Sequence, residues 1–255
     1  MDELLKYGGL LVAGFAAGAI NAVAGGGSLI SFPALIAAGY SSKEANVTNT
    51  VALWPGYVGG SLGYRAELRG QGGRLVQLAI PSMAGALVGS VVLLATPDGA
   101  FDVAVPFLIL FACLIMALQD RISVFTAGHR AAFEDTGRMP LPVLVSMFFL
   151  GIYGAYFGGA LGIITLAVFG IMLADNLQRL NALKGMSSLI INAIAVVWFA
   201  LFGPVAWAPA AVMAVGSLSG GYLGVGVARR LGKNWLRASV IVYGVVVAVV
   251  LLVRL

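Results

Sequence analysis

The chain has 255 residues, of which 60% are hydrophobic and only 10% are charged, and its net charge is +5. This composition excludes a soluble domain and indicates an integral membrane protein. The basic residues lie in short loops between apolar runs, which is typical of membrane topology signals, so the positive charge does not indicate a nucleic-acid partner.

The apolar runs are continuous rather than alternating, which favours membrane helices over a barrel. We therefore predict an all-α, polytopic membrane protein. The N-terminal run ends in Ala22-Val23-Ala24, as a signal peptide can, but Asp2 and Glu3 do not suit one, and we expect the run to stay in the mature protein. In chain order the predicted segments are 7–24, 28–38, 44–63, 75–95, 103–119, 141–159, 161–174, 180–202, 207–228 and 238–254.

Residues 14–50 start like a membrane helix, but Gly25-Gly26-Gly27-Ser28 interrupts them. A lipid-facing helix gains nothing from three glycines, each about 1 kcal/mol less favourable than alanine. A site where backbone N–H groups approach a ligand does gain from them. The short piece after the break carries Pro33, and a polar cluster follows it, so this stretch predicts a binding site.

The second half of the chain repeats the order of the first: glycine-broken short segments, an amide-bearing helix, then two ordinary spans. A shift of 137 places Gly14 on Gly151, and a shift of 135 places Asn49 on Lys184. We predict a first transmembrane repeat at 1–120, a cytoplasmic linker at 121–139 and a second repeat at 140–255. Each repeat would hold three spanning helices and one glycine-broken hairpin, which either crosses the membrane fully or is re-entrant.

Basic residues predict the orientation of these repeats. Loops 64–74, 120–139, 175–179 and 229–237 carry eleven Lys or Arg residues, against three at the other side. The positive-inside rule then puts both termini on the non-cytoplasmic side of the membrane and inverts one repeat relative to the other. The eleven residues are Arg65, Arg69, Arg74, Arg121, Arg130, Arg138, Arg179, Arg229, Arg230, Lys233 and Arg237; the three are Lys6, Lys43 and Arg254.

The sequence does not place the residues of a catalytic site or a metal site within the membrane spans. The one histidine, His129, lies in the hydrophilic connector, so no Ser–His pair can form within the membrane. Clustered metal ligands are also missing from the spans, and Cys113 lies in an apolar run that suits a core residue. We predict no enzyme activity, no metal and no cofactor.

Most polar residues within the spans are uncharged, and Lys184 is the exception. It either extends to the cytoplasmic interface or faces a substrate anion as a fixed positive charge. Exposed N–H groups at the glycine breaks would also favour an anion. The predicted substrate-binding residues are Asn21, Gly25, Gly26, Gly27, Ser28, Asn46, Thr48, Asn49, Gly158, Gly159, Gly162, Asn181, Lys184, Ser187 and Ser188; Thr165 and Asn192 are further polar residues near the breaks.

Several of these motifs resemble a known family. The run from Gly14 through Ser28, then Phe32-Pro33-Ala34-Leu35 and Asn46-Val47-Thr48-Asn49-Thr50, resembles the first block of TauE/SafE-type permeases. A looser second block covers Gly151 to Gly162. The resemblance implies an inner-membrane permease for small sulfur-containing anions such as sulfite or organosulfonates, often in the export direction.

Other functions stay open on the sequence. A permease for carboxylate anions or amino acids would use similar polar groups, and a membrane scaffold would use the glycine-rich faces to pack helices. Coupling to protons, uniport and exchange are equally compatible with the sequence, as is a homo-oligomer. Alternating access around a site in the middle of the membrane is the mechanism we expect for a transporter with such repeats.

Overall fold

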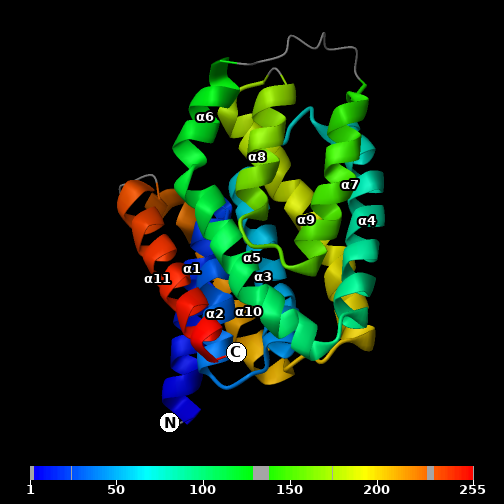
Figure 1. Cartoon of the computed structure of the whole chain (residues 1–255). Helices are drawn as coiled ribbons and strands as arrows, with labels where there is room; N and C mark the ends of the chain where they lie inside the picture. Colours follow the sequence, from blue (N-terminus) through cyan, green and yellow to red (C-terminus); the bar gives the residue numbers. More distant parts are fainter. Residues whose placement is uncertain (1–2, 24, 129–137, 174, 229–232, 255) are drawn as a thin grey trace.

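A computed structural model of the chain describes residues 3–23, 25–128, 138–173, 175–228 and 233–254 (Figure 1). Within these residues the fold consists of eleven α-helices and no strands, which confirms the all-α prediction. His129, Arg130, Arg229 and Arg230 lie outside the described residues. The helices are α1 (Glu3–Val23), α2 (Ser28–Ala37), α3 (Ser42–Gly63), α4 (Gly72–Ala95), α5 (Asp98–Ala117), α6 (Gln119–Gly128), α7 (Leu141–Tyr156), α8 (Leu161–Met172), α9 (Leu177–Phe202), α10 (Trp207–Ala228) and α11 (Lys233–Arg254).

The predicted segments correspond to ten of these helices. The structure adds α6, which begins at the end of the predicted segment 103–119 and continues into the hydrophilic stretch where no helix was expected. Local hydropathy missed α6 because it is short and polar, with Asp120 and Arg121 in its first turn. Both predicted breaks are present, one between α1 and α2 and the other between α7 and α8.

The outer surface suits a lipid environment. Among the described helices, α1, α4, α5 and α9 are long and apolar enough to cross a membrane. Large apolar side chains such as Ile80, Phe107 and Val246 are more than half exposed, and in water such a surface would be unfavourable. The protein is a multi-pass membrane protein.

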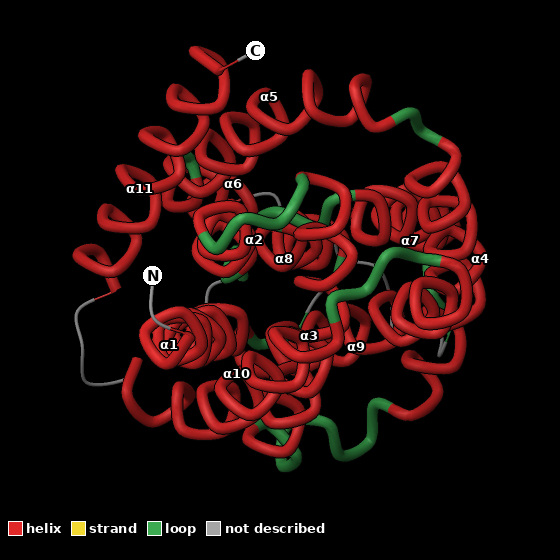
Figure 2. Tube along the Cα trace, turned by 90° about the horizontal axis from the view of Figure 1, so that it is seen from below, coloured by secondary structure: helices red, strands yellow, loops and turns green. Residues whose placement is uncertain are grey.

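The two short helices lie in the middle of the bundle. Figure 2 shows α2 and α8 at its centre, surrounded by the longer helices. With 10 and 12 residues, α2 and α8 are only about 15 Å and about 18 Å long, roughly half of the hydrocarbon thickness. α2 packs against α3 and α11, while α8 packs against α9 and α6. In Figure 1, α1 runs toward the middle of the bundle from its lower end, and α7 runs toward the middle from its upper end.

The long helices pack in a reciprocal pattern. α1 packs on α10, α7 packs on α4, and α3 and α9 contact α10 and α4 respectively. Glycines make these approaches close: a Cβ atom on Gly18 would collide with the backbone of Ser217, and one on Gly89 with the backbone of Ile152. Gly14 and Gly18, part of the family-like motif, therefore serve helix packing. The division into repeats at 1–120 and 140–255 stays a prediction.

An ion-pair cluster joins two of the basic loops at one end of the bundle. Arg74 Nη1 lies 2.6 Å from Asp175 Oδ2, and Arg179 Nε lies 3.1 Å from both carboxylate oxygens. Desolvation acts to raise the pKa of Asp175, but hydrogen bonds from the Asn176 N–H, Arg179 and Arg74 outweigh it and leave that pKa below its ordinary value. The carboxylate is therefore held in its ionised form.

Candidate functional site

The two helix breaks meet each other in the interior. A Cβ atom added to Gly25 would lie 2.7 Å from the Cα of Gly162, and one added to Gly162 would lie 3.0 Å from the Cα of Gly25. Gly25 and Gly158 also have positive φ angles of 76° and 72°, which only glycine adopts without strain. The glycines that stand out in separate halves of the sequence thus form one junction.

Asn21 caps the start of α2 across the break. Its Oδ1 accepts hydrogen bonds from the N–H groups of Gly26, at 3.1 Å, and Gly27, at 2.7 Å. From the sequence we expected these N–H groups to be exposed toward a ligand. In the structure they are paired, because backbone N–H groups buried away from water need an acceptor and the end of α1 supplies one.

Lys184 reaches the same junction from α9. It is only 2% exposed, and it is the one charged residue in the buried interior of the described residues. Nζ donates to the backbone carbonyl of Asn21 over 3.4 Å. A Cβ atom on Gly162 would lie 3.4 Å from Cδ of Lys184, so the lysine stem runs along the second break. Lys184 is thus buried inside the bundle and does not extend to the interface.

A small polar cavity lies beside this junction. Its volume has room for about one water molecule. Three predicted site residues line it: Ser28, Asn49 and Gly158. Asn192, a polar residue noted in the sequence, lines it as well. The remaining lining residues are Thr50, Leu53, Tyr57, Gly154 and Phe157.

Tyr57, Gly154 and Phe157 are cavity residues that we did not predict from the sequence. A signal for Tyr57 was present, because Thr50, Leu53 and Tyr57 follow the i, i+3, i+7 spacing of one helix face. Phe157 gave no such signal, since it comes directly after the last residue of α7. Its position depends on the backbone path of the break.

Other predicted site residues join helices rather than line the cavity. Thr48 Oγ1 accepts a hydrogen bond from the N–H of Ala206, and Asn46 Nδ2 donates to the carbonyl of Tyr156 at 2.9 Å. The carbonyl of Gly159 accepts from the Tyr153 hydroxyl. On α9, the residues buried to 6% exposure or less include Asn181, Ser187 and Ser188. The Ser188 carbonyl accepts from Asn192 Nδ2, which holds the Asn192 side chain.

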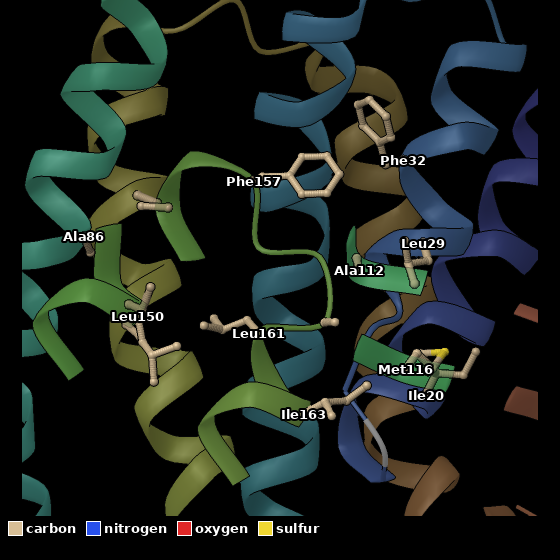
Figure 3. Packing of buried hydrophobic residues seen from close by; sticks show 14 of the residues in the cluster. Ile20, Leu29, Phe32, Ala86, Ala112, Met116, Leu150, Phe157, Leu161 and Ile163 are labelled. Carbon is tan, nitrogen blue, oxygen red and sulfur yellow. The ribbon is translucent and has the colours of Figure 1, made fainter. Parts of the chain in front are cut away.

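An aromatic pair joins the two broken hairpins. The rings of Phe32 and Phe157 pack in an edge-to-face arrangement, with their centroids 5.8 Å apart (Figure 3). Phe32 lies one helical turn beyond Ser28 on α2, and Phe157 is part of the cavity wall. Together with the bond from Asn46 to Tyr156, this pair ties α2 and α3 to the end of α7.

The site is positive and otherwise uncharged. No carboxylate in the described residues is buried, and these residues contain no cluster of His, Cys, Asp and Glu that could hold a metal ion. A buried ammonium on a helix whose other buried polar residues, such as Asn181, Ser187 and Ser188, are neutral favours a negatively charged ligand. The arrangement is suited to anion binding and offers no nucleophile–base pair.

Known proteins are similar to this chain over most of its length. The family described as "Sulfite exporter TauE/SafE" matches residues 10–251. A "Probable membrane transporter protein" of Haemophilus influenzae is 27% identical over 91% of this chain and 89% of its own length. "Probable membrane transporter protein ORF9" of Sinorhizobium sp. is 27% identical, covering 95% and 91%, and "Probable membrane transporter protein YfcA" of Escherichia coli K12 is 25% identical, covering 99% and 91%.

No solved structure matched the chain significantly. The family match covers nearly the whole chain, including both breaks and Lys184. The relatives are named as transporters, in keeping with the absence of catalytic groups from the described site. The chain belongs to the TauE/SafE sulfite exporter family and is a membrane transporter.

Proposed function

We propose that the protein is a secondary transporter that exports small sulfur-containing anions, such as sulfite or organosulfonates, by alternating access. The observation that carries this proposal is the burial of Lys184 at the junction of the two helix breaks, beside a cavity lined by uncharged polar groups. The family's name supports the sulfur anion as substrate.

The electrostatics of the site favour an anion over a cation or a neutral solute. An ammonium in a low-dielectric interior is costly unless an opposite charge or strong acceptors surround it. The described interior provides carbonyl and amide oxygens but no carboxylate. An oxyanion bound beside Lys184 would add an opposite charge there, and charge-assisted hydrogen bonds are roughly twice as strong as neutral ones.

Alternating access is supported by the size of the cavity and the position of the short helices. A cavity for about one water molecule is too small for sulfite, so the bundle must open to admit substrate. Because α2 and α8 each begin at the central junction, movement of either hairpin would open the site from one side. The helices α1 and α7 lead in from opposite ends, and α1 packs on α10 as α7 packs on α4, which supports two inverted repeats.

The proposed orientation puts the Arg74–Asp175 cluster on the cytoplasmic side of the inner membrane. The start of α1 and the end of α11 then lie on the other side. The described interior offers no carboxylate or histidine as a proton relay. Uniport and exchange therefore fit the site more simply than proton coupling does.

A ligand screen followed by transport measurements tests the proposal. Purified protein is heated with sulfite, sulfoacetate, taurine, sulfate, acetate or chloride, and the melting temperature is compared with that of the free protein. We expect sulfite or an organosulfonate to raise it and to be transported in liposomes. Stabilisation by none of these sulfur anions would overturn the proposal, and stabilisation by acetate alone would favour a carboxylate permease.

A further inference from the structure

Asn21 accepts hydrogen bonds from three donors that could otherwise bind an oxyanion. Its side-chain oxygen accepts from the N–H groups of Gly26 and Gly27, and its backbone carbonyl accepts from the ammonium of Lys184. Two adjacent N–H groups at the start of a helix, together with a nearby ammonium, are common donors for phosphate, sulfate and carboxylate groups in proteins. In this structure a single residue, only 6% exposed, accepts from all three donors.

We propose that Asn21 is an internal stand-in for the substrate. While the transporter is empty, Asn21 accepts the hydrogen bonds that a bound anion would accept from Gly26, Gly27 and Lys184; we call these three donors the anion seat. Sulfite takes over the N–H groups of Gly26 and Gly27 and binds the ammonium of Lys184, and the amide of Asn21 moves aside. This inference rests on the proposed function and adds to it a residue that determines how the empty protein behaves.

Two further observations point to a ligand at this seat. The Nδ2 atom of Asn21 is buried and has no hydrogen-bond partner among the residues that the structure describes, so the same side chain offers an unused donor. A buried unpaired donor is costly, and a substrate oxygen would satisfy it. Ser28, the residue directly after Gly27, lines the polar cavity, so the N–H groups of Gly26 and Gly27 lie next to the cavity that would have to widen to admit substrate.

The stand-in has a consequence for the transport cycle. A transporter that exports an anion without exchange must return empty through a closed state from which water is excluded. Without substrate or stand-in, the N–H groups of Gly26 and Gly27 would lack an acceptor in that state. Asn21 satisfies them, so it permits the return of the empty protein. Exchange of one anion for another needs no empty return and depends less on Asn21.

The test compares two transport modes of Asn21→Ala in sulfite-loaded liposomes. Net efflux is measured into sulfite-free buffer, and exchange is measured as the loss of labelled sulfite into buffer that contains unlabelled sulfite. We expect the ratio of net efflux to exchange to fall about tenfold or more, since each unpaired buried N–H costs on the order of one hydrogen bond. Ser90→Ala is the matched control, because Ser90 is buried and bonds to Ala86 of its own helix.

A second variant covers the case in which Asn21→Ala does not fold. Asn21→Asp keeps an acceptor for Gly26 and Gly27 and adds a negative charge near Lys184, so it should retain the melting temperature while sulfite affinity falls about tenfold or more. An unchanged ratio of net efflux to exchange in folded Asn21→Ala, or unchanged sulfite affinity in Asn21→Asp, would each overturn the stand-in. Wild-type protein that moves neither sulfite nor an organosulfonate in either mode would overturn the proposed function itself.

Discussion

Gly25 and Gly162 approach each other so closely that a side chain at Gly25 would collide with the backbone of Gly162. A Cβ atom on Gly25 would lie 2.7 Å from the Cα of Gly162, and the neighbour is backbone, which cannot rotate away. The φ angle of 76° at Gly25 adds strain for any other residue. The contact joins the two helix breaks beside the stem of Lys184.

We therefore expect Gly25→Ala to lower the free energy of unfolding by about 2 kcal/mol or more, since it combines steric overlap with backbone strain. Gly185→Ala is the control, because Gly185 lies on α9 beside Lys184 with nothing within 4 Å of an added Cβ atom. That variant should be as stable as the wild type or slightly more so. Thermal unfolding in detergent measures both, and equal melting temperatures would show that the fold does not require this close contact.

Lys184→Met should remove anion binding while preserving the fold. Methionine has a similar length and is apolar, so it fills the space along Gly162 without the charge. Loss of a charge-assisted hydrogen bond of about 1.5–3 kcal/mol predicts a rise of about ten- to hundredfold in the Kd for sulfite. Isothermal titration gives the Kd, and size-exclusion chromatography checks assembly. An unchanged Kd would show that Lys184 has only a structural role.

The Arg74–Asp175–Arg179 cluster should make stability depend on pH. The pKa of Asp175 is lower in the folded protein than in the unfolded chain, so the cluster stabilises the fold above the unfolded-state pKa. That contribution is lost as the pH falls through the lowered folded-state value. Wild type and Asp175→Asn should therefore differ at neutral pH, by about 1 kcal/mol in stability, and their melting temperatures should converge in acid. A constant difference across this range would contradict the assignment.

Asn46→Ala should loosen the end of α7. The variant removes the donor to the Tyr156 carbonyl and with it a hydrogen bond that ties α3 to α7 near the Phe32–Phe157 pair. We expect faster amide hydrogen exchange in the last turn of α7 and in the break that follows. Ser90→Ala removes a bond within α4 alone and should leave exchange in this segment unchanged. Equal exchange in wild type and Asn46→Ala would mean that this bond does not hold the end of α7.

Cysteine labelling tests the proposed orientation. Cys113 is 3% exposed, and Cys113→Ser provides a background without cysteine. Arg69→Cys lies in the loop before α4, and Gly99→Cys lies near the start of α5; both positions are exposed. In intact cells an impermeant maleimide should label Gly99→Cys, whereas Arg69→Cys should react only after permeabilisation. The opposite pattern would reverse the orientation.

Much of the fold could be predicted from the sequence because its signals are local. Hydropathy identified the long helices, successive glycines marked both breaks, and a charge in an apolar helix singled out Lys184. The shift of 135 that places Asn49 on Lys184 also brings the first residues of α3 and α9 into register. Such features need only neighbouring residues to be recognised.

The tertiary structure decided which of these residues share a site. Thr48 and Asn46 look as suitable as Asn49 in the sequence, yet they bond to Ala206 and Tyr156, while Asn49 lines the cavity. The capping of Gly26 and Gly27 by Asn21, and the bond from Lys184 to its carbonyl, depend on the path of the break after α1 and on where α9 crosses it. Composition and local motifs are enough to predict a membrane transporter with two broken hairpins. Which donors are already paired depends on packing between distant helices, because each buried N–H must find its acceptor in three dimensions.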